Sequence, residues 1–141
     1  MATLAHCLDD DERAFALNTE AVGVLMATAN QRELGFALNN LGLLNAHKGD
    51  FPLGVRRLKK SLVIGFEVGA DPLTMVALES LAEVACLQER FERGVRLIAA
   101  ANAGRTQTGA ALCGQNKMEC EELLDLARCS LSAADFESAS R

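Results

Sequence analysis

The segment Phe51–Arg56, which reads FPLGVR, returns forty residues later as FERGVR at Phe91–Arg96. A second stretch repeats upstream with the same offset, since Ala37–Leu44 (ALNNLGLL) lines up with Ala77–Val84 (ALESLAEV). All four stretches carry apolar residues at helical spacing. The duplicated unit is therefore predicted to be a helix, a tight turn and a second helix, which is typical of stacked repeat proteins.

A weaker copy precedes these two. Leu17–Asn30 resembles Leu58–Asp71 at an offset of forty-one residues, and matches only one half of the unit. We therefore expect a single domain over residues 1–141. Its predicted parts are a half repeat at 9–30, a repeat at 31–70, a repeat at 71–106 and C-terminal capping helices at 115–141.

Local signals mark where the helices begin and end. Asn30 and Glu33 have capping-box spacing, as do Asn116 and Glu119, and Asp50 can cap a helix that has Pro52 in its first turn. The acids at 9–12 are expected at the N-terminus of the first helix, where the helix dipole favours negative charge. The predicted helices are 9–29, 30–48, 50–69, 71–88, 91–105 and 116–131, with a loop at 106–114 and a short last helix from Ser132.

Small residues lie where the two helices of a pair would cross. Gly42 and Ala82 occupy matching positions on the first helices, and Gly54 and Gly94 occupy matching positions on the second ones. Glycine inside a helix lowers helix stability, so it needs another reason to be there. We expect these residues to let the paired helices approach closely.

Composition excludes several classes of protein. The formal net charge is −5, which disfavours general nucleic-acid binding, and half of the chain is hydrophobic with only 4% aromatic residues. No apolar run reaches the roughly 18–20 residues of a membrane span, and the first residues lack a basic segment before an apolar one. We expect a cytoplasmic protein that does not bind membranes.

Side chains that could support catalysis or metal binding are few. The five cysteines form no Cys-x-x-Cys pair, and we interpret most of them as small apolar residues with free thiols. A redox-sensing cluster of Cys113, Cys120 and Cys129 is the alternative. His6 lies beside Cys7 near the chain start, and His47 is expected to cap a helix at the surface. We predict no catalytic residues, no metal and no cofactor.

Two basic clusters occupy matching repeat positions. Arg56, Arg57, Lys59 and Lys60 form the first, and Arg90, Arg93 and Arg96 form the second. Stacking would align them in one stripe, which could pair with the acids Glu79, Glu83 and Glu89, bind an anionic partner or simply be solvated.

The first helices of the pairs carry polar residues that could line an inner groove. Asparagine is a mediocre helix former, so its recurrence in a helix suggests a role other than helix stability. Its amide can hold a peptide backbone through paired donor and acceptor contacts. The alternative is that these residues merely face solvent. The predicted groove residues are Glu33, Asn39, Asn40, Asn45, Glu79 and Glu83.

These motifs resemble a known family. Leu38-x-x-Leu41-Gly42, followed by a turn, Gly54, Leu58 and Ser61, is similar to the tetratricopeptide repeat, with a longer period and fewer aromatics. The resemblance implies an all-α fold of antiparallel helix-pair repeats stacked in a right-handed superhelix.

A closer resemblance is to the C-terminal repeat region of large bacterial ATP-binding LuxR-type transcriptional regulators. It is carried by Ala37–Gly42, Gly49–Asp50, Ser61–Leu62, Leu78–Ala82 and Arg96–Ala101, and extends to the tail. The phosphate-binding Gly-x-x-x-x-Gly-Lys-Ser/Thr motif is missing from the sequence, and we expect no basic helix-turn-helix-like end after it. The resemblance therefore implies a regulatory or scaffolding piece, either a fragment or a stand-alone relative, that does not bind DNA directly.

We expect a non-catalytic module that binds a protein or peptide partner. A domain that senses a small molecule or peptide in the groove is the alternative, and a small helical enzyme is the third. We expect the first predicted helix to have no preceding repeat that covers it, so that Phe15, Val22, Leu25 and Met26 are partly exposed and favour a homodimer, or mark a domain cut from a longer chain.

Overall fold

The computed structural model describes the backbone of residues 2–109 and 114–141, and the side chains of residues 10–109 and 120–141. All regular structure in these parts of the chain is helical, without any strand. The all-α prediction is confirmed. The described helices are α1 (Ala2–Met26), α2 (Gln31–His47), α3 (Phe51–Glu67), α4 (Asp71–Leu87), α5 (Phe91–Thr108), α6 (Gly114–Ser130) and α7 (Ala133–Ser140).

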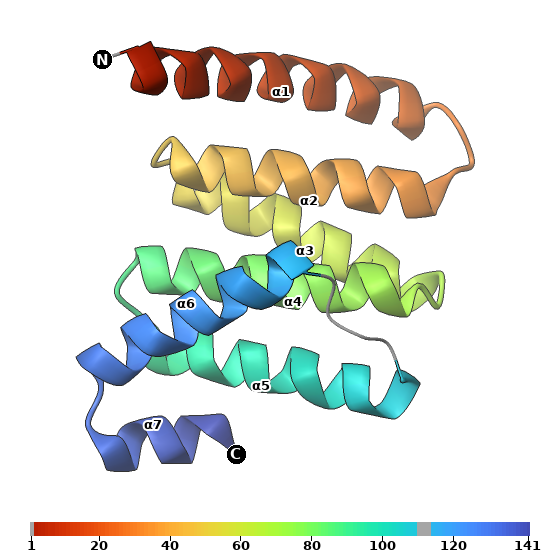
Figure 1. Cartoon of the computed structure of the whole chain (residues 1–141). Helices are drawn as coiled ribbons and strands as arrows, with labels where there is room; N and C mark the ends of the chain where they lie inside the picture. Colours follow the sequence, from red (N-terminus) through yellow and green to blue (C-terminus); the bar gives the residue numbers. More distant parts are fainter. Residues whose placement is uncertain (1, 110–113) are drawn as a thin grey trace.

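Consecutive helices pack against each other from α1 to α5, and short turns make neighbours run in opposite directions (Figure 1). The first helices of the two pairs, α2 and α4, also contact each other. α6 crosses in front of α4 and contacts α4 and α5, while α7 packs on α5 (Figure 1). The second helix of the first pair, α3, lies behind α2 and α4, so α6 and α3 are on opposite sides of α4 (Figure 1).

The turns between the helices follow the local signals of the sequence. The side chains of Asn30 and Asp50 accept hydrogen bonds from the backbone N–H groups of Glu33 and Leu53, each at 3.3 Å. Gly49 and Gly69 end α2 and α3 with φ of +89° and +62°, which a side chain rarely tolerates. Glu89 takes the same conformation after α4, with φ of +59°.

Several predicted boundaries were wrong. α1 begins at Ala2 and not at residue 9, so Asp10, Asp11 and Glu12 lie inside a helix and do not cap its start. The start of α4 at Asp71 is as predicted, with Ala70 at the N-cap position and no side-chain cap. α5 continues through the first part of the predicted loop, where the hydroxyls of Thr106 and Thr108 donate to carbonyls one turn back, and it ends at a left-handed Gly109. α6 begins two residues before the predicted cap.

Some predictions lie outside the described residues. They concern the side chains of His6, Cys7, Cys113 and Asn116–Glu119.

The glycine contacts confirm the predicted close approach of the paired helices. A Cβ on Gly54 would lie 2.8 Å from the carbonyl oxygen of Gly42 and 3.3 Å from the Cβ of Ala46. In the next pair, a Cβ on Gly94 would lie 2.6 Å from the sulfur of Cys86 and 3.3 Å from the carbonyl oxygen of Ala82. Each contact residue of the first pair has its counterpart forty positions later, so the duplication in sequence is also a duplication in packing.

The core lies between the helix layers. Leu58 and Leu73 are completely buried, and Leu41 and Ile98 nearly so. None of the described helices is both long and apolar enough to cross a membrane.

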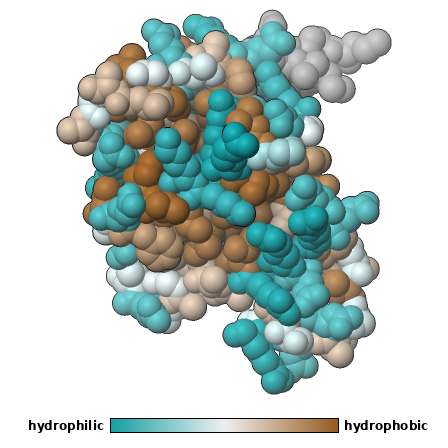
Figure 2. All heavy atoms as spheres, turned by 180° about the vertical axis from the view of Figure 1, so that it is seen from behind, coloured by the Kyte–Doolittle hydropathy of each residue, from teal (hydrophilic) through white to brown (hydrophobic). Residues whose placement is uncertain are grey.

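Seen from behind, the molecule carries hydrophobic side chains in the middle of its face, with hydrophilic ones around and among them (Figure 2). Val63 and Phe66 on α3 and Val68 just after its end are exposed.

Candidate functional site

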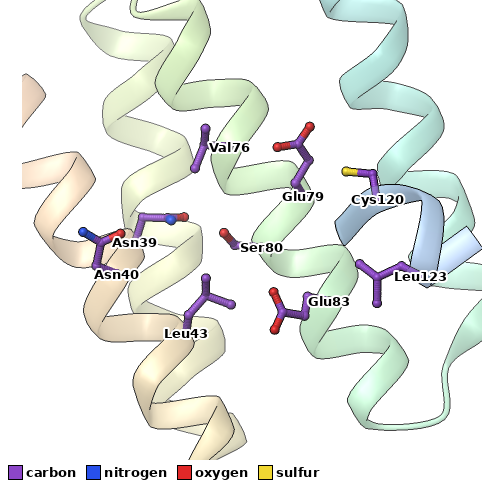
Figure 3. Close-up of a pocket in the computed structure, with 9 residues that line it drawn as sticks. All are labelled: Asn39, Asn40, Leu43, Val76, Glu79, Ser80, Glu83, Cys120 and Leu123. Atoms are coloured by element: carbon purple, nitrogen blue, oxygen red, sulfur yellow. The ribbon is translucent and has the colours of Figure 1, made fainter. Parts of the chain in front are cut away.

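Matching positions of α2 and α4 face one another across a polar pocket. α2 contributes Asn39, Asn40 and Leu43, and α4 contributes Glu79, Ser80 and Glu83, which stand forty residues further on. Steps of three and four residues keep such positions on one side of a helix. α6 closes the pocket with Cys120 and Leu123 (Figure 3). We call this cavity, of about 160 Å³ and completed by Val76, the polar pocket.

Four of the six predicted groove residues therefore line one cavity, and two do not. Asn45 is buried and accepts a hydrogen bond from the guanidinium of Arg57, so it ties α2 to α3. Glu33 is exposed in the first turn of α2. Both lie six residues from Asn39, and at roughly 100° per residue such a step turns a side chain by about 120° away from the shared face.

Asn39 has a buried side-chain oxygen without a hydrogen-bond partner in the described part of the chain. The residue is only 2% exposed, and its carboxamide points from α2 toward α4 (Figure 3). Its Oδ1 atom is buried and has no hydrogen-bond partner among the described residues. Leaving a buried acceptor unpaired costs about 1–3 kcal/mol, so this oxygen favours the arrival of a donor.

Glu79 is held by an ion pair that the sequence analysis missed. Arg105 of α5 donates to its carboxylate, and the two side chains are 11% and 10% exposed. A buried carboxylate needs such a partner, since an unpaired one would be strongly destabilising. The guanidinium thus neutralises Glu79 and fixes it at the wall of the pocket.

Glu83 bridges α4 to α2. Its carboxylate lies 2.6 Å from Nε2 of His47, with the side chains 27% and 45% exposed. His47 does lie in the last turn of α2, as predicted for a cap, but its ring also contacts the neighbouring repeat.

A larger, mainly apolar pocket continues from the polar one. It has a volume of about 440 Å³ and shares Leu43, Glu83 and Leu123 with the polar pocket. Leu87 and Leu126 are about half exposed in its wall. The two cavities together form what we call the inner groove, between α2 and α4 on one side and α6 on the other. The remaining lining residues of the apolar pocket are His47, Cys86 and Glu122.

The thiol of Cys86 in the groove is not an activated nucleophile. Burial, and then the negative charge of Glu83, raises the pKa of the Cys86 thiol, which keeps it neutral. Cys120 is buried whereas Cys129 is exposed, and nine residues on a helix turn their side chains by about 180° from each other. The alternative of a thiol cluster is therefore wrong for these two residues. Within the described side chains, no group of three His, Cys, Asp or Glu residues could hold a metal ion.

Part of the predicted basic stripe does assemble. Lys59 of α3 joins Arg90 and Arg93 around a separate cavity of about 150 Å³ beside α4. The alternative in which the stripe pairs with Glu79 and Glu83 is wrong, because these carboxylates are bonded to Arg105 and His47.

No protein-family model, no curated protein and no solved structure matches this chain. The function therefore has to be inferred from the groove itself. Its polar and apolar halves adjoin, and its polar half contains a buried acceptor without a partner.

Proposed function

We propose that this protein is a non-catalytic interaction module that binds a segment of a partner protein in the inner groove. The main support is the polar pocket, where side chains at the same repeat positions of α2 and α4 converge around the unpaired oxygen of Asn39. Amide and hydroxyl groups suit the backbone and polar side chains of a peptide, and the adjoining apolar pocket suits a large hydrophobic side chain.

A tetratricopeptide-like stack with a right-handed superhelical twist is part of this proposal. It is supported by the forty-residue duplication and by the matching contacts at Gly54 and Gly94. In such stacks the first helix of each pair lines the inner surface, which is the role we assign to α2 and α4. The resemblance to LuxR-type regulators adds a regulatory role in the bacterial cytoplasm, exerted through a protein partner without direct contact to DNA.

A peptide-display selection against the full chain tests this function. Asn40 is exposed at the polar pocket, so Asn40→Arg places a long side chain across it. Gln31→Arg makes the same change in the first turn of the same helix, outside the groove. We expect selected peptides to bind Asn40→Arg about tenfold more weakly, or worse, and Gln31→Arg normally. Equal binding to both variants would refute groove binding.

The size of the apolar pocket favours one alternative, an effector-sensing domain. Its volume of about 440 Å³ lies within the range of small-molecule sites, which is about 300–1,000 Å³. A small effector would raise the melting temperature of the isolated protein, since a ligand at about 100 times its Kd stabilises by about 2.7 kcal/mol. A metabolite screen that gives such a shift, together with a peptide selection that gives no binder, would favour sensing.

We also propose that the outer face of α1 mediates a homodimer. Val22 and Leu25 pack against the core cluster around Leu34, so they are half-buried on the inner side of α1. The outer side exposes other apolar residues than those expected, namely Leu17 and Val24 at 59% each. The predicted Met26 is also exposed, but at the end of α1 and on another side of the helix. Contact with a second α1 would cover Leu17 and Val24.

A further inference from the structure

We infer that the polar pocket binds the ammonium group of a lysine side chain from the partner segment, an inference that rests on the proposed groove binding. The pocket offers oxygen acceptors to such a group, beside the N–H donors of the Asn39 and Asn40 amides. Asn39 Oδ1 is buried and has no partner among the described residues, and the hydroxyl of the buried Ser80 lies in the same wall. An ammonium group has three donors and no acceptor, so it complements this set.

The charges around the pocket select a cation over an anion. The lining residues include the carboxylates of Glu79 and Glu83 and no Lys or Arg. Arg105 neutralises Glu79 from α5, but the partner of Glu83 is His47, which offsets a carboxylate only when its imidazole is protonated. A bound anion would face Glu83 and the oxygen of Asn39 at close range, which is unfavourable in a partly buried site.

The dimensions fit one side chain. A cavity of about 150 Å³ accepts a ligand of the size of benzene, and the polar pocket has about 160 Å³. Leu43, Val76 and Leu123 form apolar parts of the wall, against which the methylene stem of a lysine can pack while its ammonium reaches Asn39.

The acceptors favour an ammonium over a guanidinium. Arginine binds best where a carboxylate can receive two parallel N–H bonds. Glu79 already has a guanidinium partner in Arg105, and Glu83 is bonded to His47. The other side-chain oxygens of the pocket, Asn39 Oδ1, Asn40 Oδ1 and the Ser80 hydroxyl, are single oxygens, which suit a point charge with donors in several directions.

The adjoining pocket extends the expected motif. Because Leu43, Glu83 and Leu123 belong to both cavities, a segment whose lysine enters the polar pocket places a neighbouring side chain in the apolar one. The partner segment is therefore basic and hydrophobic, which also suits the net charge of −5 of this chain.

Nuclear magnetic resonance titrations of the full chain test the inference with three defined probes. They are N-acetyl-lysine amide, its neutral analogue N-acetyl-norleucine amide and N-acetyl-arginine amide. We expect the lysine probe to give saturable shifts at Asn39, Ser80 and Glu83, and the norleucine probe to bind about tenfold more weakly or not at all. Equal binding of lysine and norleucine probes, or shifts away from the pocket, would overturn the inference. Tighter binding of the arginine probe would overturn the choice of an ammonium.

Asn39→Leu separates a binding role from a structural one. This near-isosteric change removes the unpaired oxygen, so the free protein should melt at a higher temperature while its affinity for the lysine probe falls about tenfold. A lower melting temperature with unchanged affinity would mean that Asn39 serves the fold, and would overturn the inference.

A charge-matched pair of variants keeps the test independent of that core substitution. Glu83→Gln removes one negative charge at the pocket, and Glu67→Gln removes one at an exposed site near the end of α3. Only Glu83→Gln should weaken binding of the lysine probe. An equal loss of affinity in both variants would mean that the probe responds only to the overall charge of the protein, and would overturn the inference. Selected peptides that are sensitive to Asn40→Arg but lack lysine would refute this inference alone, whereas insensitivity to Asn40→Arg would refute the proposed function itself.

Discussion

Gly54→Ala should destabilise the protein, although alanine is the better helix former. The added Cβ would lie 2.8 Å from the carbonyl oxygen of Gly42 and 3.1 Å from the backbone nitrogen of Ala46. Both atoms belong to the backbone of α2, so no side-chain rotation can relieve the clash and the two helices have to move apart. Overpacking of this kind costs about 1–3 kcal/mol, and the gain in helix propensity returns about 1 kcal/mol. Because the contact is with backbone, we expect a net loss of about 1–2 kcal/mol.

Gly23→Ala is the matched control for this prediction. Gly23 lies in the exposed part of α1, and a Cβ there would have no atom within 4 Å. The same substitution should therefore stabilise the protein by about 0.5–1 kcal/mol through helix propensity. Urea denaturation followed by circular dichroism measures both changes. If Gly54→Ala were as stable as Gly23→Ala, the close crossing of α2 and α3 would be wrong.

Three further predictions concern the ion pair, the buried thiol and α1. Arg105→Met should lower the free energy of unfolding by about 3 kcal/mol, and adding Glu79→Met should recover part of it, because a lone buried carboxylate is worse than none; a larger loss in the double variant in urea denaturation would contradict this. Burial raises the pKa of Cys86 above its ordinary 9.0, so its contribution to stability is complete below that pH and is lost as the pH rises toward the folded-state pKa. Wild type should thus lose more melting temperature than Cys86→Ala between about pH 8 and about pH 10, and identical losses would count against this effect. Light scattering should give twice the chain mass of 15.1 kDa for wild type and once that mass for a Leu17→Lys, Val24→Lys double variant; a wild-type monomer would exclude the dimer.

The parts of the fold that local sequence could predict are those that local interactions determine. Asp50 and Gly49 define a turn whose hydrogen bonds and positive φ involve only neighbouring residues. The close crossings could be predicted because a glycine in the middle of a helix, such as Gly54, lowers helix stability, and close packing against a neighbouring helix is what offsets that loss. The acids at 9–12 resemble a helix start, so the true start of α1 was missed. Exposed acids are also tolerated inside a helix, and no residue before position 9 breaks one.

The groove could be predicted only in part. Its α2 and α4 walls follow from helical periodicity, and stricter use of that periodicity would have excluded Asn45 and added Ser80 and Leu43. The role of Arg105 could not be predicted from local sequence, because its partner Glu79 lies 26 residues away on another helix. The wall made by α6 was also out of reach, since the apolar side of a helix does not indicate which earlier helix it packs against.

The most direct test is a crystal structure of the full chain with a peptide selected against it. We predict that the peptide lies in the inner groove, with a lysine ammonium at Asn39 Oδ1 and a hydrophobic side chain beside Leu87 and Leu126. A peptide seated elsewhere, for example on the exposed Val63 and Phe66 of α3, would contradict the assignment of α2 and α4 as the binding surface.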